Sequence, residues 1–237
     1  MKKRIWELDA LRGLLILGMV LVHLVYDLQN FLGLSILAES PIFDFFLSWG
    51  GVLFFLLSGL CATLGSRPVR RGAMVLGVGL LCTAVTLAGR ALGMLPDYMV
   101  IRFGVLHCLG ACMLLWPVFR KLPVWLLAAL GTGFGVLGIY LTQCVMVEFP
   151  GFAWLGLLYP SYSSADYFPL LPYLGFFLLG AVLGRTVYAK KESLLPKVDE
   201  KKGILRFLCG CGKHSLWIYL LHQPILAGFC MGLSYLV

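Results

Sequence analysis

Residues 11–31 read LRGLLILGMVLVHLVYDLQNF, an apolar run in which only Arg12, His23 and Asp27 ionise near neutral pH. An α-helix needs about 20 predominantly apolar residues to cross the roughly 30 Å hydrocarbon core of a bilayer. The run is too long for the apolar region of a signal peptide and lacks a small-residue cleavage site. We therefore predict that it is a retained membrane-spanning helix.

The rest of the chain repeats this pattern. Hydrophobic residues make up 60% of the 237 residues and charged residues 13%, about half the charge that is usual in a soluble domain. The sequence predicts an all-α transmembrane helical bundle with about seven spans in a single domain, residues 1–237. The predicted spans are 11–31, 42–65, 71–94, 102–120, 122–147, 168–189 and 214–236. Five or six crossings are the alternative, if one segment re-enters the membrane.

The charges of the connections alternate along the chain. The connections at 32–41, 95–101 and 148–167 contain acidic residues and no basic one. The other connections are rich in basic residues, which are Lys2, Lys3, Arg4, Arg67, Arg70, Arg71, Arg120, Lys121, Arg185, Lys190, Lys191, Lys197, Lys201, Lys202 and Arg206. Basic loops stay on the cytoplasmic side, which predicts a cytoplasmic N-terminus and an external C-terminus. The net charge of +8 is thereby explained by topology, and we expect no nucleic-acid partner.

The eight cysteines do not predict a metal site or disulfides. Most lie inside apolar runs, where cysteine is a small hydrophobic residue. The remaining two, Cys209 and Cys211, lie in a connection that we place in the reducing cytoplasm. A Cys-x-Cys pair alone supplies only two of the four ligands of a structural zinc site. We expect the connection at 190–206, the longest polar stretch, to be a loop that is partly disordered.

The first predicted span carries a polar stripe. Asp9, Arg12, Met19, His23 and Asp27 follow one another at steps of three, seven, four and four residues, which places them on one helix face. Ionisable groups within a span are costly and usually line a bundle interior or a cavity. We predict that His23 is catalytic and that Asp27 orients it. The alternatives are a helix-end ion pair for Asp9 and Arg12 and a purely structural role for His23.

Further polar residues lie at the predicted outer ends of other spans. Asp44 opens the second span, and Arg102 and His107 lie at the start of the fourth. With His23 and Asp27 they predict one outer layer suited to acid–base work on a polar substrate, although Asp44 and Arg102 also fit interfacial charges. His222, before Pro224 in the last span, is a further candidate for substrate binding.

Three arginines on the predicted cytoplasmic side, Arg67, Arg70 and Arg71, are candidates for holding the phosphates of a nucleotide-bearing donor. The positive-inside rule alone also explains them. The sequence contains no Walker loop, no G-x-S-x-G elbow and no H-E-x-x-H motif.

Four motifs occur together in a fixed order. They are Glu7-Leu8-Asp9-x-x-Arg12-Gly13 with His23-x-x-Tyr26-Asp27, Phe54-Phe55-Leu56-Leu57-Ser58-Gly59, Arg102-Phe103-Gly104-Val105-Leu106-His107, and Gly212-Lys213-His214-Ser215 through His222-Gln223-Pro224. In this order they resemble the catalytic membrane domain of heparan-α-glucosaminide N-acetyltransferase and its small bacterial relatives. The first and last motifs also resemble the wider superfamily of membrane acyltransferases that modify cell-surface sugars.

The resemblance implies an acetyltransferase that passes an acetyl group from cytoplasmic acetyl-CoA to an extracytoplasmic amino sugar or glycan. It implies that His23 is the catalytic base or a transient acetyl carrier, that Asp9 and Arg12 shape an inner or central cavity, and that Arg102 and His107 bind donor or acceptor. The chain is shorter than the full-length enzymes, and a homodimer is one way to complete a channel. We expect a multi-pass protein of a bacterial plasma membrane, in contact with lipid and without a metal. A small-solute or proton-coupled transporter and a non-catalytic assembly partner are the alternatives.

Overall fold

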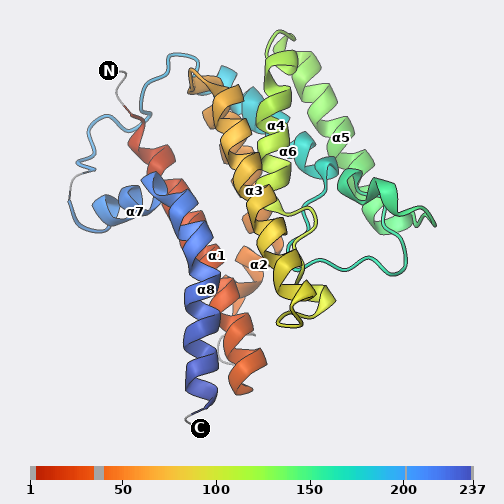
Figure 1. Cartoon of the computed structure of the whole chain (residues 1–237). Coiled ribbons are helices and arrows are strands. Elements are labelled where there is room, and N and C mark those ends of the chain that lie inside the picture. The colour runs from red at the N-terminus through yellow and green to blue at the C-terminus, as the bar shows by residue number, and fades with distance from the viewer. Residues whose placement is uncertain (1–3, 35–39, 201, 236–237) are drawn as a thin grey trace. The chain divides into compact units, whose positions relative to one another are not determined.

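The computed structural model describes residues 4–34, 40–200 and 202–235, and its regular structure in these ranges is helical (Figure 1). The α-helices are α1 Trp6–Leu32, α2 Pro41–Leu64, α3 Pro68–Ala91, α4 Val105–Phe119, α5 Val124–Cys144, α6 Leu170–Thr186, α7 Gly203–Lys213 and α8 Ser215–Ser234. Two short 3-10 helices, η1 Asp97–Met99 and η2 Pro150–Leu155, lie in the connections. The all-α prediction is confirmed.

Five helices are long and apolar enough to cross a membrane, namely α1, α2, α3, α5 and α8. They match five of the seven predicted spans to within a few residues at most ends. The other two spans, predicted at 102–120 and 168–189, correspond to the shorter apolar helices α4 and α6, of 15 and 17 residues. At about 1.5 Å per residue these two helices measure roughly 22 and 25 Å. The length and apolar composition of these helices therefore identify a multi-pass membrane protein.

The two shorter helices begin later than predicted because extended segments precede them. Phe103 pairs with Tyr167 in an isolated parallel bridge, and the Phe168 amide donates to the Phe103 carbonyl at 3.1 Å. Gly104 and Pro169, the residues before α4 and α6, both have extended backbones. The apolar residues of 100–104 and 165–169 thus pair with each other instead of extending the helices.

Helix α7 was not predicted. The sequence placed its first residues in a polar loop, whereas the chain becomes helical at Gly203. The segment before α7 is held to the start of α1, because Glu7 accepts hydrogen bonds from the Ser193 hydroxyl at 2.8 Å and the Leu194 amide at 2.7 Å. The connection between α6 and α8 therefore includes a segment bound to α1 and a helix.

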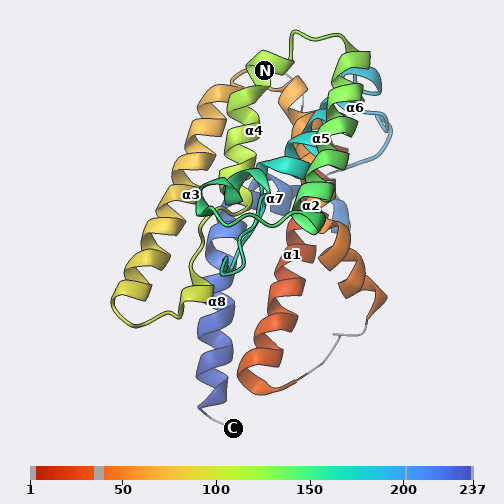
Figure 2. The same ribbon diagram turned by 90° about the vertical axis from the view of Figure 1, so that its right-hand side faces the viewer.

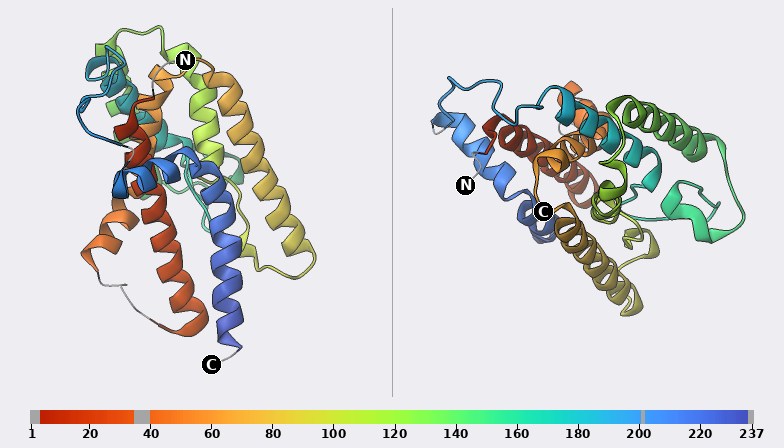
Figure 3. Two further views of the ribbon diagram at one scale, coloured as in Figure 1. Left: turned by 90° about the vertical axis from the view of Figure 1, so that its left-hand side faces the viewer. Right: turned by 90° about the horizontal axis from the view of Figure 1, so that it is seen from above.

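The chain forms two compact units, and the predicted single domain stays a prediction. Residues 1–54 and 190–237 make up the first unit, which contains α1, the first part of α2, α7 and α8. In this unit α1 and α8 lie side by side and run in the same direction (Figure 3). Helix α7 lies across α1 and turns at His214 into α8 (Figure 1). The parallel course of α1 and α8 agrees with the predicted topology, in which both cross from inside to outside.

Two motif glycines form the crossing of α1 and α7. A Cβ atom at Gly13 would collide with the Leu208 carbonyl, and one at Gly212 would collide with the Asp9 carbonyl. The contact is reciprocal, and it joins the two backbones without intervening side chains. Small residues allow such close approach between helices in a membrane. The first and last sequence motifs thus meet in the folded chain.

Residues 55–189 form the second unit, with the end of α2 and helices α3 to α6. In this unit α3 packs on α4 and α5 packs on α6 (Figure 2). The end of α2 packs against α6 through another reciprocal pair, because a Cβ at Gly59 would meet the Phe177 carbonyl and one at Gly180 the Leu56 carbonyl.

Some predictions fall on residues that the structure does not describe. They concern the basic residues Lys2, Lys3 and Lys201, the acidic Glu39, and the last residue of the span predicted at 214–236. These positions lie outside the described residues.

Candidate active site

Two histidines from the two ends of the sequence meet between α1 and α8. The ring centroids of His23 and His222 are 4.8 Å apart, and the ring planes are inclined by 78°. His23 was predicted as catalytic and His222 as a substrate-binding group. The parallel packing of α1 and α8 brings them into direct contact, which the sequence did not predict.

Backbone carbonyls fix the hydrogen positions on both rings. His23 Nδ1 lies 2.9 Å from the Met19 carbonyl, and His222 Nδ1 lies 2.6 Å from the Tyr219 carbonyl. A carbonyl only accepts hydrogen bonds, so each Nδ1 must carry the hydrogen. In the neutral ring Nε2 then has a free lone pair. His222 Nε2 is buried and makes no hydrogen bond within the described residues.

Asp27 lies one helical turn beyond His23 and is buried, with 2% of its surface exposed. Gln223 Nε2 donates to both of its carboxylate oxygens, at 3.2 Å each. The sequence predicted that Asp27 orients His23, but the Met19 carbonyl is the group bonded to the His23 ring. Asp27 instead holds Gln223, the residue next to His222. Gln223 Oε1 is buried without a hydrogen-bond partner among the described residues.

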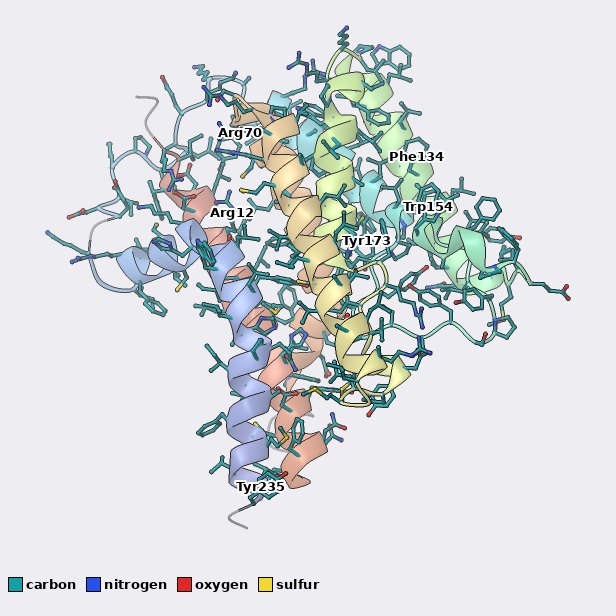
Figure 4. All side chains as sticks on the ribbon, in the orientation of Figure 1. Arg12, Arg70, Phe134, Trp154, Tyr173 and Tyr235 are labelled. Carbon is teal, nitrogen blue, oxygen red and sulfur yellow. The ribbon has the colours of Figure 1, made fainter. Side chains whose placement is uncertain are left out.

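At the other end of α1, Asp9 and Arg12 form an ion pair. Arg12 Nη1 donates to Asp9 Oδ1 at 3.0 Å, and Arg4 lies 3.8 Å from the same carboxylate. Asp9 is buried, and Arg12 lies near the crossing of α1 and α7 (Figure 4). The ion pair given as the alternative for Asp9 and Arg12 is present, while the role of both residues in a cavity stays a prediction.

Asp44 lies in the first turn of α2 and is exposed. The Ser40 hydroxyl accepts a hydrogen bond from the Phe43 amide at 3.2 Å and so caps this helix. An acidic side chain in the first turn is favourable to the helix dipole. The helix dipole therefore gives a local reason for an acidic residue at this position. The predicted contact of Asp44 with substrate stays a prediction.

Arg102 joins two connections of the second unit that were predicted to lie on the outer side. Its Nη2 donates to both oxygens of Asp97 at 2.9 and 3.1 Å, and its Nε donates to the Ser163 carbonyl at 2.9 Å. Arg90 also pairs with Asp97, at 2.9 Å. Asp166 was not among the predicted site residues, and its carboxylate accepts a hydrogen bond from the Val105 amide at 2.9 Å and so caps α4. No local signal identifies this cap, because Asp166 lies shortly before α6 and 61 residues beyond Val105, the first residue of α4.

His107 is buried, and both of its ring nitrogens are used within the second unit. The Gly104 amide donates to Nδ1 at 3.2 Å, so Nε2 carries the hydrogen and donates to the Thr83 hydroxyl at 3.1 Å. His107 thus closes the first turn of α4 and ties that helix to α3. It has no free lone pair comparable with those of His23 and His222, and its predicted substrate contact stays a prediction.

Three exposed arginines surround the beginning of α3. Arg67, Arg70 and Arg71, with Ser66 and Met74, line a depression of about 420 Å³. Arg70 is visible at the start of α3 in Figure 4. No carboxylate of the described residues pairs with any of the three. Unpaired guanidinium groups beside the free amides of a helix N-terminus form an arrangement that suits phosphate.

The predicted site residues are divided between the two units. His23, Asp27, His222, Asp9, Arg12 and Asp44 belong to the first unit, and Arg67, Arg70, Arg71, Arg102 and His107 belong to the second. The structure brings His23, Asp27 and His222 together in the first unit. The predicted outer layer that joins them to Arg102 and His107 stays a prediction. In the described ranges, no three His, Cys, Asp or Glu side chains gather in a way that could hold a metal ion.

The comparison with protein families gives one match. The model of the heparan-alpha-glucosaminide N-acetyltransferase catalytic domain matches residues 4–224, nearly the whole chain. Comparison with curated proteins and with solved structures gave no match. The match includes both histidines of the α1–α8 pair and the glycines that join α1 to α7. The chain therefore belongs to the heparan-alpha-glucosaminide N-acetyltransferase catalytic family, a family of acetyl-CoA-dependent N-acetyltransferases.

Proposed function

We propose that this protein moves an acetyl group from cytoplasmic acetyl-CoA to an extracytoplasmic amino sugar or cell-surface glycan. The membership in an N-acetyltransferase family supports the reaction type. The alternating charge of the connections supports the sidedness, because basic loops stay in the cytoplasm. A bacterial plasma membrane is our proposal for its location.

The observation that carries the proposal is the pair of imidazoles with free Nε2 atoms. Either role of His23, base or acetyl carrier, needs an unprotonated ring nitrogen, and the Met19 carbonyl leaves Nε2 in that form. His222 offers the same atom next to it. With two neighbouring histidines, one can carry the acetyl group while the other acts as the base, whereas a single histidine would have to perform both tasks.

We assign the covalent role to His23 and the base role to His222. The His23 Nε2 lone pair attacks the thioester carbonyl carbon, a C–N bond forms, the C–S bond breaks, and sulfur leaves with the bonding electrons as the CoA thiolate. The acceptor amine then attacks the acetyl carbon and breaks its bond to Nε2, which regains its lone pair. His222 Nε2 takes the proton that the amine loses. Splitting the transfer into two easier steps is the general advantage of covalent catalysis.

The arginines of α3 support binding of the donor on the cytoplasmic side. Acetyl-CoA carries phosphate groups, and the depression at Arg67, Arg70 and Arg71 offers three unpaired guanidinium groups. The acetyl group has to reach the histidine pair on α1 and α8. The proposal therefore assigns donor binding to the second unit and chemistry to the first.

The test uses purified protein in detergent with acetyl-CoA labelled in the acetyl group, with and without glucosamine. We expect the wild type to release CoA and to transfer label to glucosamine, while His23→Ala releases none. Gln29→Ala is the matched control, since Gln29 is an exposed polar residue of the same helix. Its activity should equal that of the wild type. Thermal unfolding in detergent verifies that each variant is folded.

Two results would overturn the proposal. A folded wild type that neither binds acetyl-CoA nor releases CoA would favour a transporter, which uptake into proteoliposomes would then reveal. Full activity of His23→Ala would remove His23 from the chemistry while leaving the reaction class intact.

A further inference from the structure

Helix α7 has two different faces. One face contains the buried Cys209 and Gly212 and packs against α1. The opposite face, with Ile218 of α8, lines a groove of about 520 Å³. The lining residues are Gly203, Arg206, Phe207, Gly210, Cys211, His214 and Ile218. We call this space the α7–α8 groove.

Two glycines leave the helix backbone uncovered in the groove. A Cβ atom added at Gly203 or Gly210 would meet no atom within 4 Å. Phe207 and Ile218 supply apolar walls beside these glycines. The space over these two glycines is therefore not filled by other atoms, and the apolar walls beside it suit a hydrocarbon portion of a ligand.

The groove also carries positive charge. The charge is that of Arg206, which lies in the first turn of α7. Helix α7 contains Arg206 and Lys213 but no acidic residue, and no carboxylate of the described residues pairs with Arg206. A guanidinium without an acidic partner at the edge of an apolar groove is complementary to a phosphate group with hydrocarbon attached.

The apolar surface extends from the groove in two directions. On α7, Ile204 and Phe207 are 66% and 56% exposed. On α8, Ile218 begins a series continued by Leu221, Ile225 and Phe229 at steps of three, four and four, which is one helix face. These last three side chains are more than half exposed. A short basic helix with exposed apolar side chains, leading directly into a span, is typical of a helix in the membrane interface.

We propose that the α7–α8 groove binds an anionic phospholipid of the cytoplasmic leaflet. Arg206 holds the phosphate, and an acyl chain follows Phe207 and Ile218 onto the exposed face of α8. The choice of leaflet rests on the predicted cytoplasmic position of the connection at 190–206. The proposal is independent of the acetyl transfer, because it concerns neither the histidine pair nor the arginines of α3.

The test is native mass spectrometry of the purified full chain from micelles that contain equal amounts of phosphatidylglycerol and phosphatidylcholine. We expect one retained phosphatidylglycerol. Arg206→Gln should weaken its retention about tenfold or more, since hydrogen bonds to charged groups are the stronger class. Gly210→Leu, which fills the groove and leaves the charge in place, should also weaken it. Lys197→Gln, at an exposed basic residue outside the groove, should retain the lipid as the wild type does.

Other outcomes would overturn the proposal. Equal retention of phosphatidylcholine would mean that the groove does not select an anionic lipid. Displacement by glycerol phosphate, which has the head group and no acyl chain, would indicate a site for soluble anions. Displacement by acetyl-CoA would indicate a donor site. The experiment contains no acceptor and measures no acetyl transfer. A failure of the lipid proposal can therefore be distinguished from a failure of the proposed acetyltransferase activity.

Discussion

Gln223 Nε2 donates to both carboxylate oxygens of Asp27, and these two residues are 196 positions apart in the sequence. The pair links α1 to α8 directly beside His23 and His222. Because Asp27 is buried, removing the Gln223 amide would leave its carboxylate without this hydrogen-bond donor, which costs free energy. The pair therefore holds the two helices in the register that brings the imidazoles together.

We predict measurable coupling between Asp27 and Gln223. Gln223→Ala and Asp27→Ala should each destabilise the protein, and the double variant should be less destabilised than the sum. The coupling should be on the order of 1 kcal/mol, in the upper part of the range for polar pairs between membrane helices. Reversible unfolding in a denaturing detergent measures it. Strictly additive effects would mean that the hydrogen bonds do not contribute to stability.

The base role of His222 predicts a partial reaction. His222→Ala should still release CoA in a single turnover and should retain label on the protein, because the acetyl group can reach His23 without it. Turnover with glucosamine should fall by about 10²- to 10⁴-fold, the usual effect of removing a positioned base. Rapid acid quench followed by peptide mapping would locate the label. A His222→Ala protein that never accumulates label would favour direct transfer with His23 as base.

Most helical segments were predictable because a run of apolar residues along the chain identifies each of them. The run at 11–31 specifies a span by length and composition alone, and α1 follows it closely. Helix α7 was missed because its 11 residues are too few for a membrane span, although its polar and apolar residues lie on different faces. The start of α4 was missed because contacts with a distant segment determine it, among them the hydrogen bond from the Val105 amide to Asp166, 61 residues away.

The candidate site was predictable residue by residue but not as an arrangement. An ionisable residue in a span is unusual enough to identify His23, Asp27 and His222 individually. That His222 faces His23 depends on the parallel packing of α1 and α8, which no local pattern encodes. His107 had the same local signature, yet both of its nitrogens serve the start of α4 and the link to α3. Hydrogen-bond partners, and not the residue type, distinguish these cases.

Because α1 and α7 cross in backbone contact, we predict that replacing glycine by alanine destabilises the protein more at this crossing than at an open position. Gly212→Ala places a Cβ against the Asp9 carbonyl, so it should lower the apparent melting temperature and the yield of folded protein. Gly228→Ala is the control, because a Cβ there meets nothing within 4 Å and alanine favours a helix over glycine. Fluorescence-detected size-exclusion chromatography after heating compares the two. Equal melting temperatures would show that the two helices separate easily.

The cysteines offer a test of the predicted topology. Cys144 is exposed at the end of α5, on the predicted outer side, and Cys211 lies on α7, on the predicted inner side. In single-cysteine variants, a membrane-impermeant maleimide added to intact cells should label Cys144 alone. Permeabilised cells should also show labelling of Cys211. Labelling of Cys211 in intact cells and of Cys144 only after permeabilisation would reverse the topology.

Cys209 should react slowly even after permeabilisation. Burial, followed by the nearby carboxylate of Asp9, raises the pKa of the Cys209 thiol above its usual value. Its Sγ lies 3.4 Å from the Trp6 carbonyl, to which it donates. Since the thiolate is the reactive form, the raised pKa leaves less of it at neutral pH. From pH 7 to 9 the labelling rate of Cys209 should therefore stay below that of the less buried Cys211, and equal rates across that range would contradict the shift.

The arginines of α3 predict a defect in donor binding rather than in chemistry. Arg70→Gln combined with Arg71→Gln should raise the KM for acetyl-CoA about tenfold or more, with kcat nearly unchanged, because uniform binding energy is lost. The KM of the wild type should rise with ionic strength, since these side chains are exposed and salt screens exposed charges. Lys121→Gln removes an exposed positive charge from another predicted cytoplasmic connection and should leave the KM unchanged. An equal rise for Lys121→Gln would indicate a general electrostatic attraction of the donor, whereas a lower kcat at constant KM would place these arginines in the transfer step.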